Sequence, residues 1–416
     1  MKFKKNKISI LALIFALMFS SINPRIKCDE SSWIQIWTKD MDYASDIAID
    51  SNDTLYIVGH VEKDNDQDIC LLKYNKSGGL IWVQIWDIND TEYRGHLSIV
   101  IDKSDNLYIA RNKGLIKCDS NGNILWNVTF SAFTLSKYRY SIKIDSLDNI
   151  YIASYTDDYG IFIAKFDSSG SQLGNFTWGT SEPIEYVDIT IDDFDNLYVL
   201  AKAPYSLASY LVKLNSLCIE LWNISIIGYD SIPLSLAADS ENNIFSVFSD
   251  KLIKINSSGQ ILWTISNTFT GCDELSIDSY GNVYCVGEHL SKGPCIDYTL
   301  FDGIRAYMSC TAIFIIKYNN SGEFLWEKLC TSCSSASAAG VVFDTLNNLY
   351  LCGTLIIDRS GAYRWDIILF KNPSNVSGAC ICIYYDVIAL IVILIIMAIT
   401  IPIYLNFKKR KLKKEK

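Results

Sequence analysis

The stretch DKSDNLYIA, residues 102–110, is repeated with small changes seven times along a chain of 416 residues. Its core is the pattern Asp-x-x-x-Asn-apolar-aromatic, and the copies are DSNDTLY from Asp50, DKSDNLY from Asp102, DSLDNIY from Asp145, DDFDNLY from Asp192, DSENNIF from Asp239, DSYGNVY from Asp278 and DTLNNLY from Asp344. The period is about 45 residues, except where an insertion lengthens the sixth unit. The chain is therefore an array of one structural unit.

Each unit contains two turn signals separated by short alternating apolar runs. In the first turn, the Asp side chain can accept hydrogen bonds from backbone N–H groups just downstream, and Asn tolerates the left-handed conformation. The second turn contains Ser-Gly or Asn-Gly in most units, which allows a tight hairpin with positive φ. In the second unit the runs are SIVID, NLYIA, GLIKCD and ILWNVTF. Four antiparallel strands at this period predict one blade of a β-propeller.

Two units depart from the pattern near their fourth strand. In most units the fourth strand begins with an apolar-Leu-Trp signature, and its Trp is Trp82, Trp126, Trp222, Trp263 or Trp326. The third unit has Gly174 where Trp is expected. The fourth keeps its Trp but replaces the Gly turn with NSLC.

The two ends of the repeat array complement each other. The seventh unit stops after RWDIILFKNPSN, before any closing Trp strand, whereas the chain opens its first unit with a surplus SSWIQIW. That surplus closely resembles LIWVQIW, residues 80–86, which is the fourth strand of the first unit. We predict an all-β, seven-bladed β-propeller in which the strand at residues 33–37 completes the seventh blade. Such closure removes the exposed sheet edges that invite aggregation.

Both termini carry apolar segments flanked by basic residues. Residues 1–21 have a basic start and an apolar run of about twelve residues, which is typical of a secretory signal and short for a membrane span. Residues 387–405 are apolar and uncharged, and a basic tail follows them directly, as for a transmembrane helix with its tail in the cytoplasm. The alternatives are an N-terminal membrane anchor and a buried core helix.

These features divide the chain into five parts. We expect a signal peptide and mature N-terminus over 1–28, the propeller over 29–372 and a juxtamembrane linker over 373–386. A transmembrane helix over 387–405 and a basic cytoplasmic tail over 406–416 complete the chain. The expected localisation is the cell membrane, single-pass with type I topology and the propeller extracellular.

Charge excludes one class of partner. The whole chain has a net charge of −9, and its two basic ends each carry +6, which leaves −21 on residues 29–407. A body of this charge is repelled by nucleic-acid phosphates, so we expect no nucleic-acid partner.

The repeats resemble the SBBP class of β-propeller repeat over roughly residues 33–371, and more loosely the NHL and quinoprotein-like propellers. This resemblance rests on turn and packing residues. It implies a propeller that is secreted or surface-tethered, and it implies no particular chemistry. The quinoprotein likeness would imply a bound quinone, but no cluster of ligands stands apart from the repeat, so we expect no cofactor.

Cysteines and glycosylation sequons agree with an extracellular domain. Thirteen cysteines in a secreted chain indicate disulfides, and Cys295 and Cys310 flank the insertion in the sixth unit. Cys285 and Cys352 occupy equivalent, adjacent positions of neighbouring blades, where we expect buried side chains or a link between blades. Asn-x-Ser/Thr occurs at Asn52, Asn75, Asn89, Asn127, Asn175, Asn223, Asn256, Asn319 and Asn375, although Asn and Ser are also common turn residues here.

No motif of a known catalytic class is present. The repeated Asp-x-x-x-Asn lacks the Gly and Glu of a calcium loop, and CTSC at residues 330–333 has no second pair at zinc spacing. We therefore expect structural turns, no metal site and no catalytic residue. The most individual segment is the insertion SKGPCIDYTLFDGIRAYMSCT, residues 291–311. The candidate binding residues in it are Tyr298, Phe301, Arg305, Tyr307 and Met308. Aromatic and Arg side chains are frequent in binding hot spots.

The function that these observations favour is non-catalytic recognition of a surface protein or glycan, as in an adhesion-type ectodomain. The alternative is an extracytoplasmic lyase, hydrolase or quinoprotein-like enzyme with a pocket at the channel mouth, where carboxylates, His and Arg converge. The insertion can also simply fold over its own blade. Sequence alone leaves the ligand and the oligomeric state open.

Overall fold

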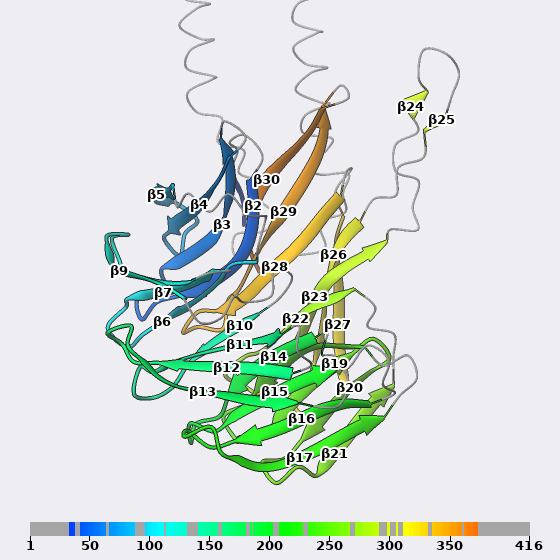
Figure 1. Cartoon of the computed structure of the whole chain (residues 1–416). Coiled ribbons are helices and arrows are strands. Elements are labelled where there is room, and N and C mark those ends of the chain that lie inside the picture. The colour runs from blue at the N-terminus through cyan, green and yellow to red at the C-terminus, as the bar shows by residue number, and fades with distance from the viewer. Residues whose placement is uncertain are drawn as a thin grey trace, which may run out of the picture.

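The described part of the molecule is built from β-strands. The computed structural model describes residues 33–37, 42–63, 66–87, 96–111, 114–130, 140–156, 160–179, 184, 186–202, 208–227, 232–266, 271–290, 298–299, 305–306, 311–331, 335–359 and 362–372. Seven four-stranded antiparallel sheets follow one another around a ring, with one extra two-stranded sheet (Figure 1). The predicted all-β, seven-bladed propeller is confirmed.

The first three blades show the repeat in its plain form. Within each, the strands pair in chain order from the innermost to the outermost. Blade 1 contains β2 (Asp42–Ile49), β3 (Leu55–Lys63), β4 (Asp66–Tyr74) and β5 (Leu80–Trp86). Blade 2 contains β6 (Ser98–Ile101), β7 (Leu107–Arg111), β8 (Gly114–Cys118) and β9 (Ile124–Thr129). Blade 3 contains β10 (Ser141–Ile144), β11 (Ile150–Thr156), β12 (Gly160–Phe166) and β13 (Gln172–Gly179).

Blades 4 to 6 keep this order, and the sixth carries the insertion. Blade 4 contains β14 (Tyr186–Ile191), β15 (Leu197–Lys202), β16 (Ala208–Leu214) and β17 (Glu220–Ile227). Blade 5 contains β18 (Pro233–Ala238), β19 (Ile244–Phe248), β20 (Lys251–Ile255) and β21 (Ile261–Ser266). Blade 6 contains β22 (Cys272–Ile277), β23 (Val283–Leu290), β26 (Thr311–Tyr318) and β27 (Phe324–Thr331), with β24 (Tyr298–Thr299) and β25 (Arg305–Ala306) in the insertion.

The N-terminal strand completes the seventh blade, as the sequence predicts. This sheet has the order β1-β30-β29-β28, with β28 (Ser335–Phe343), β29 (Leu349–Arg359), β30 (Ala362–Lys371) and β1 (Trp33–Trp37). The register of β1 on β30 runs from Trp33 opposite Lys371 to Trp37 opposite Ile367. In five of the other six blades a Trp lies opposite the same Lys position, for example Trp126 opposite Lys117. Trp33 therefore takes the place of the missing seventh Trp, and blades 1 and 7 lie side by side in Figure 1.

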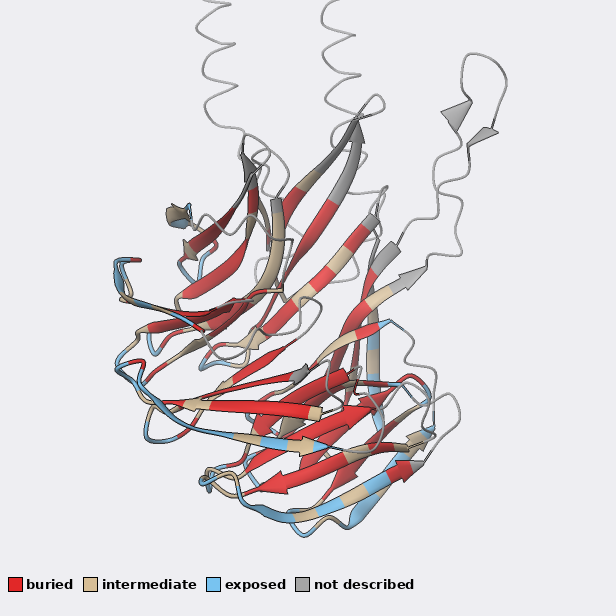
Figure 2. Cartoon of the chain, viewed as in Figure 1, coloured by how far each residue is buried: buried red, intermediate tan, exposed pale blue. Residues whose placement is uncertain are grey.

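The core lies between blades. Apolar side chains of adjacent blades share single clusters, such as Val58 and Leu71 of blade 1 with Leu107 and Ile109 of blade 2. Figure 2 shows the inner strands mostly buried, whereas β9, β13 and β21 alternate between exposed and half-buried residues. Burial between blades explains why second strands such as β7 and β15 read as nearly continuous apolar runs and the outermost ones do not.

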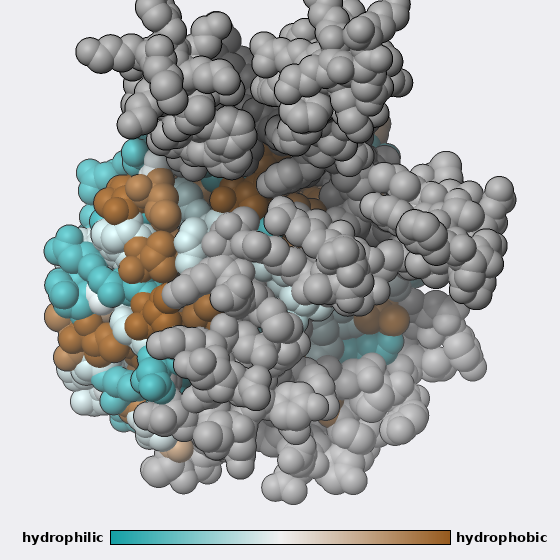
Figure 3. Space-filling model, turned by 90° about the horizontal axis from the view of Figure 1, so that it is seen from above, coloured by the Kyte–Doolittle hydropathy of each residue, from teal (hydrophilic) through white to brown (hydrophobic). Residues whose placement is uncertain are grey.

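Exposed apolar side chains gather where the outer strands begin. This group comprises Leu80, Ile81, Ile124, Leu125, Leu173, Ile219, Leu221, Ile261, Leu262, Phe324 and Leu325, each about half exposed. Seen from above, the described surface carries apolar patches beside hydrophilic ones (Figure 3). The apolar pair before each Trp thus contributes to the surface as well as to the sheet.

Both turns of a blade lie at the same end of it, because one joins strands 1 and 2 and the other joins strands 3 and 4. We call this end of the ring the turn face and the opposite end the loop face. The turns share one hydrogen-bond scheme, in which an Asp or Asn side chain accepts from the N–H groups two and four residues on. Their fourth residue has positive φ, as at Asp105 (φ 61°) and Gly122 (φ 81°).

The expected terminal segments lie outside the described residues. The predicted signal segment over 1–28 and the parts over 373–386, 387–405 and 406–416 are among them. Within the residues that the structure describes, no helix has the length and apolar character to span a bilayer.

Candidate functional site

The repeated Asp is a structural group in every blade. In the second blade, Asp102 accepts the N–H groups of Ser104 (2.9 Å) and Asn106 (2.8 Å). Its Oδ2 also accepts the Tyr108 hydroxyl at 3.2 Å, and the Lys117 ammonium lies 3.3 Å away. Burial opposes ionisation of Asp102, but the hydrogen bonds from Asn106 and its neighbours outweigh it and lower the pKa of the carboxyl. This confirms the interpretation of the motif as a turn.

The lysine that lies beside the repeated Asp in each of several blades also joins that blade to the next one. Lys117 donates to the carbonyl oxygen of Ser168 in blade 3 at 3.1 Å, and Lys165 donates to that of Ser216 in blade 4 at 2.7 Å. Each ammonium also lies over the ring of the motif Tyr of its own blade, as Lys117 does over Tyr108 at 4.6 Å. The motif Lys and Asp therefore couple turn formation to blade stacking.

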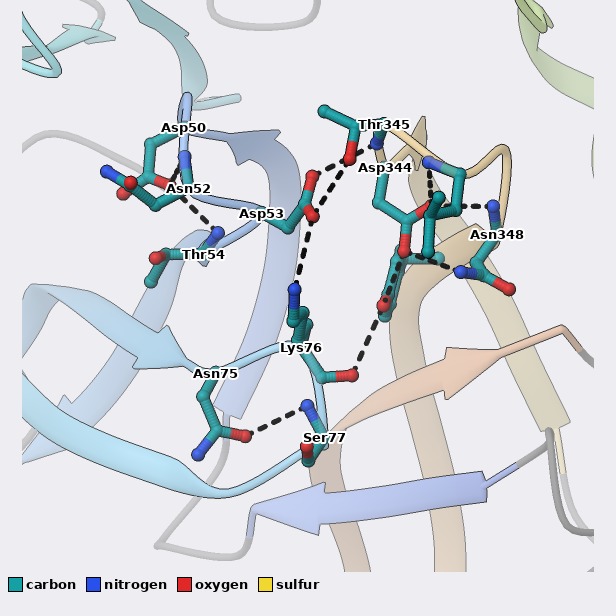
Figure 4. Close-up of polar contacts among 12 residues, drawn as sticks. Asp50, Asn52, Asp53, Thr54, Asn75, Lys76, Ser77, Asp344, Thr345 and Asn348 are labelled. Atoms are coloured by element: carbon teal, nitrogen blue, oxygen red, sulfur yellow. Dashed lines mark hydrogen bonds and ion pairs between the residues drawn. The ribbon is translucent and has the colours of Figure 1, made fainter.

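A second set of carboxylates links one turn to the next around the turn face. Ser51 of blade 1 donates its N–H and hydroxyl to Asp105 of blade 2, at 3.0 and 2.8 Å. Thr345 of blade 7 does the same to Asp53 of blade 1, at 3.0 Å for both bonds, and this contact crosses the point of ring closure (Figure 4). Most carboxylates of the turns therefore accept hydrogen bonds that hold the fold together.

A central channel forms a cavity among the described residues. It has a volume of about 300 Å³ and is lined by the innermost strand of every blade. Polar residues recur four positions before the motif Asp in six blades: Asp46, Ser98, Ser141, Asp188, Ser235 and Glu274. Gly340 holds this position in the seventh, where an added Cβ would lie 3.0 Å from an Asp46 carboxylate oxygen.

Several of these channel groups bridge adjacent blades. Asp46 Oδ2 accepts the Ser98 hydroxyl at 2.7 Å and the Ile99 N–H at 3.0 Å, both from blade 2. Asp188 of blade 4 accepts the N–H of Leu236 in blade 5, also at 3.0 Å. Burial raises the pKa of Asp46, although these hydrogen bonds and the Lys143 ammonium oppose that effect. We did not predict from the sequence that these polar residues line a channel. Their recurrence four positions before the motif Asp is the pattern that could have indicated it.

The predicted binding residues lie in the insertion between β23 and β26, and the structure brings only part of them together. Tyr298 pairs with Ala306 and Thr299 with Arg305 in the small β24–β25 sheet. Phe301, Tyr307 and Met308 lie outside the described residues. Leu290 and Thr311 are Cα partners at the base of the insertion, so this segment leaves the blade at the loop face.

An acidic pair stands near the base of the insertion. Glu288 precedes Leu290 by two residues in β23, and its backbone N–H donates to Gly271 at 2.6 Å. Burial, with a smaller contribution from the nearby Asp273 carboxylate, raises the pKa of Glu288 to about 7. This carboxyl can therefore change its charge near neutral pH.

The described cysteines form no disulfide with one another. These are Cys70, Cys118, Cys218, Cys272, Cys285 and Cys352. Cys285 lies seven residues after its motif Asp and Cys352 eight, so they face opposite sides of their blades, toward blade 5 and blade 1 respectively. A link between them is therefore excluded. Both are buried, as expected. Cys295 and Cys310 lie outside the described residues.

The described residues contain no cluster of His, Cys, Asp or Glu suited to a metal ion. Among the sequons, Asn75, Asn256 and Asn319 open outer turns of the turn face, and their side-chain oxygens accept turn N–H groups. Asn127, Asn175 and Asn223 lie on the outermost strands β9, β13 and β17. Whether any of them carries a glycan stays a prediction.

Comparisons with known proteins find similar chains only among solved structures. No protein-family model matches the chain, and no curated protein does. Among solved structures, a Bacteroides caccae protein of unknown function is 12% identical with a TM-score of 0.42, covering 71% of this chain and 94% of that one. The WD40 domain of Neurospora crassa Pan2 is 9% identical with a TM-score of 0.49, covering 80% and 89%.

A quinonprotein alcohol dehydrogenase-like protein from Bacteroides thetaiotaomicron is 13% identical with a TM-score of 0.47, covering 70% of this chain and 66% of that one. At these identities the likeness concerns architecture alone. The chain is a seven-bladed β-propeller whose neighbours include WD40 and quinoprotein-like propellers.

Proposed function

We propose that this chain is a membrane-tethered, extracellular propeller that binds a surface protein or a glycan through its loop face, without catalysis. The observation that carries the proposal is that strand β1 begins and strand β30 ends on the face opposite to the base of the insertion. Trp33 and Lys371 are paired partners at the turn face, and Asn372 there accepts the N–H of Leu349 at 2.8 Å. The insertion leaves from Leu290 and returns at Thr311, at the opposite end of its blade.

This separation suits a tethered receptor. A C-terminal helix over 387–405 would hold the propeller from the end of β30, and the insertion would then stand on the face that is not used for attachment. The insertion is rich in Tyr, Phe, Arg and Met, which are frequent in the centres of protein interfaces. SBBP-like repeats, which the sequence resembles, agree with a surface location.

The test replaces the insertion without opening its blade. Because Leu290 and Thr311 are direct partners, Asn-Gly can join β23 to β26 as a two-residue hairpin. The matched control replaces residues 203–208 with Asn-Gly between Lys202 and Ser209, which are partners in blade 4. The full chain displayed on cells is screened against glycans and surface proteins. A ligand lost with the insertion but kept by the control supports the proposal, and one kept by both variants contradicts the assigned face.

A second candidate is an enzyme that uses the channel. The specific observation is the convergence of Asp46, Lys143 and Glu274 on one cavity, together with the raised pKa of Asp46. The volume of about 300 Å³ limits such a substrate to a small molecule. Turnover of small esters or glycosides that disappears in Asp46→Asn and persists after removal of the insertion would favour this candidate.

A further inference from the structure

One side of the channel wall presents hydrogen-bond donors without partners. Lys143 of β10 lines the cavity, and its ammonium forms no ion pair or hydrogen bond with a described residue. Ser141 and Thr190 line the same cavity from blades 3 and 4, and their relative exposures are only 9% and 6%. Neither hydroxyl has a hydrogen-bond partner among the described residues. Both residues line the channel, so their hydroxyls can form hydrogen bonds to whatever fills it.

Ser141 differs from three of its equivalents in the other blades. At the same position four residues before the motif, Asp46, Asp188 and Ser235 accept the N–H of the following blade. Ser141 makes no such bridge to blade 4 in the described structure. Its hydroxyl is therefore available to the cavity, next to the Lys143 ammonium two residues away.

The carboxylate of Asp188 stands on the same side as Thr190, but it already accepts from Ile189, Ser235 and Leu236. The opposite side of the channel is acidic as well. Blade 7 lies across the ring from blades 3 and 4, and blades 1 and 6 flank it with Asp46 and Glu274. Asp46 accepts three hydrogen bonds, from Ile47, Ser98 and Ile99. A carboxylate has about four acceptor sites, so one remains. Between these acids the wall of blade 7 is apolar, with Ala339, Val341 and Val342.

We propose that the channel binds a small zwitterion of amino-acid size. Its carboxylate contacts the Lys143 ammonium and the hydroxyls of Ser141 and Thr190, and its ammonium faces Asp46 and Glu274. A simple anion would meet three wall carboxylates, and a simple cation would leave Lys143 without a partner. The cavity of about 300 Å³ holds a molecule of this size with some water.

The test uses a molecular ruler and the full chain in detergent micelles. Glycine, β-alanine, γ-aminobutyrate and 5-aminovalerate are titrated by calorimetry, with acetate and propylamine as singly charged controls. We expect at least one zwitterion to bind at least about tenfold more tightly than both controls, because only it pairs both walls. No binding of any zwitterion at millimolar concentration would overturn the proposal and leave water as the occupant.

Two variants locate the binding. Lys143→Met should weaken the best zwitterion at least about tenfold, and the isosteric Thr190→Val should weaken it about threefold or more. Lys328→Met, on the outer strand β27, is the matched control and should leave affinity unchanged. If Lys143→Met does not fold, Thr190→Val decides alone. Unchanged affinity in a folded channel variant would overturn the assignment. The insertion plays no part here, so failure of this test leaves the proposed partner binding untouched.

Discussion

Gly174 of blade 3 and Cys218 of blade 4 are a matched pair of exceptions. In four other blades the outer Trp packs on the turn Gly of the next blade, and a Cβ at Gly170 would lie 3.2 Å from the Trp126 ring. Gly174 stands where that Trp is expected, and a Cβ there would meet open space. Cys218 then replaces the turn Gly with φ 57° and is half-buried. Loss of the indole makes room for the thiol.

We predict that substitutions at Gly174 and Cys218 have strongly non-additive effects on the free energy of unfolding. Gly174→Trp alone should destabilise the propeller by about 1–3 kcal/mol, because the indole meets Cys218. Adding Cys218→Gly should recover most of that loss and give a coupling energy of at least about 1 kcal/mol. Urea denaturation of the detergent-solubilised chain measures both. Gly170→Cys, beside the intact Trp126, is the matched control and should be destabilising. Simple additivity of the two changes would disprove the pairing.

The motif Asp should matter far more than the Asp of an outer turn. Asp145 is 5% exposed and accepts bonds from Leu147, Asn149 and Tyr151 beside the Lys165 ammonium. Asp145→Ala should cost about 3–5 kcal/mol, because it leaves a largely buried ammonium without its counter-ion. Asp167→Ala in the exposed outer turn should cost about 1 kcal/mol. Equal losses in chemical denaturation would contradict the structural role of the motif.

Glu288 predicts a pH-dependent stability. Its pKa in the folded chain is about 7, above the ordinary value of 4.5. A raised pKa favours the folded state at low pH, and this contribution is lost as the pH rises from about 4.5 to 7. Glu288→Gln should therefore raise stability by about 1–3 kcal/mol at pH 8 and change it little at pH 5. Thermal unfolding at both values is the measurement, and an equal effect at the two pH values would refute the assignment.

Much of the fold could be predicted from local sequence because the repeat encodes turns. Asp102 with Asn106 specifies a turn through bonds within five residues, and such chemistry is readable without tertiary structure. Ring closure was also predictable, because Trp33 repeats the pattern of an outer strand that the seventh unit lacks. Each inference used only the spacing of similar residues.

The channel could not be predicted in the same way. Asp46 and Ser141 occupy one repeat position, yet only the packing of blades decides that the first bridges to its neighbour and the second does not. A one-residue offset also separates Cys285 from Cys352 and places their thiols on opposite faces. Of the predicted insertion residues, the structure describes only the backbone pairings of Tyr298 and Arg305, so their binding role stays a prediction.

Closure of the ring by the N-terminal strand is the claim on which the other proposals depend. Gln35 lies opposite Leu369 in the β1–β30 register. Cysteines placed at both positions should form an intrachain disulfide under mild oxidation, identified by mass spectrometry of the linked peptides. Gln84→Cys with Leu369→Cys is the matched control, because Gln84 pairs with Leu71 in blade 1, and it should remain unlinked. A 35–369 bond without an 84–369 bond is the predicted result, and absence of the 35–369 bond in the folded protein would contradict the closed propeller.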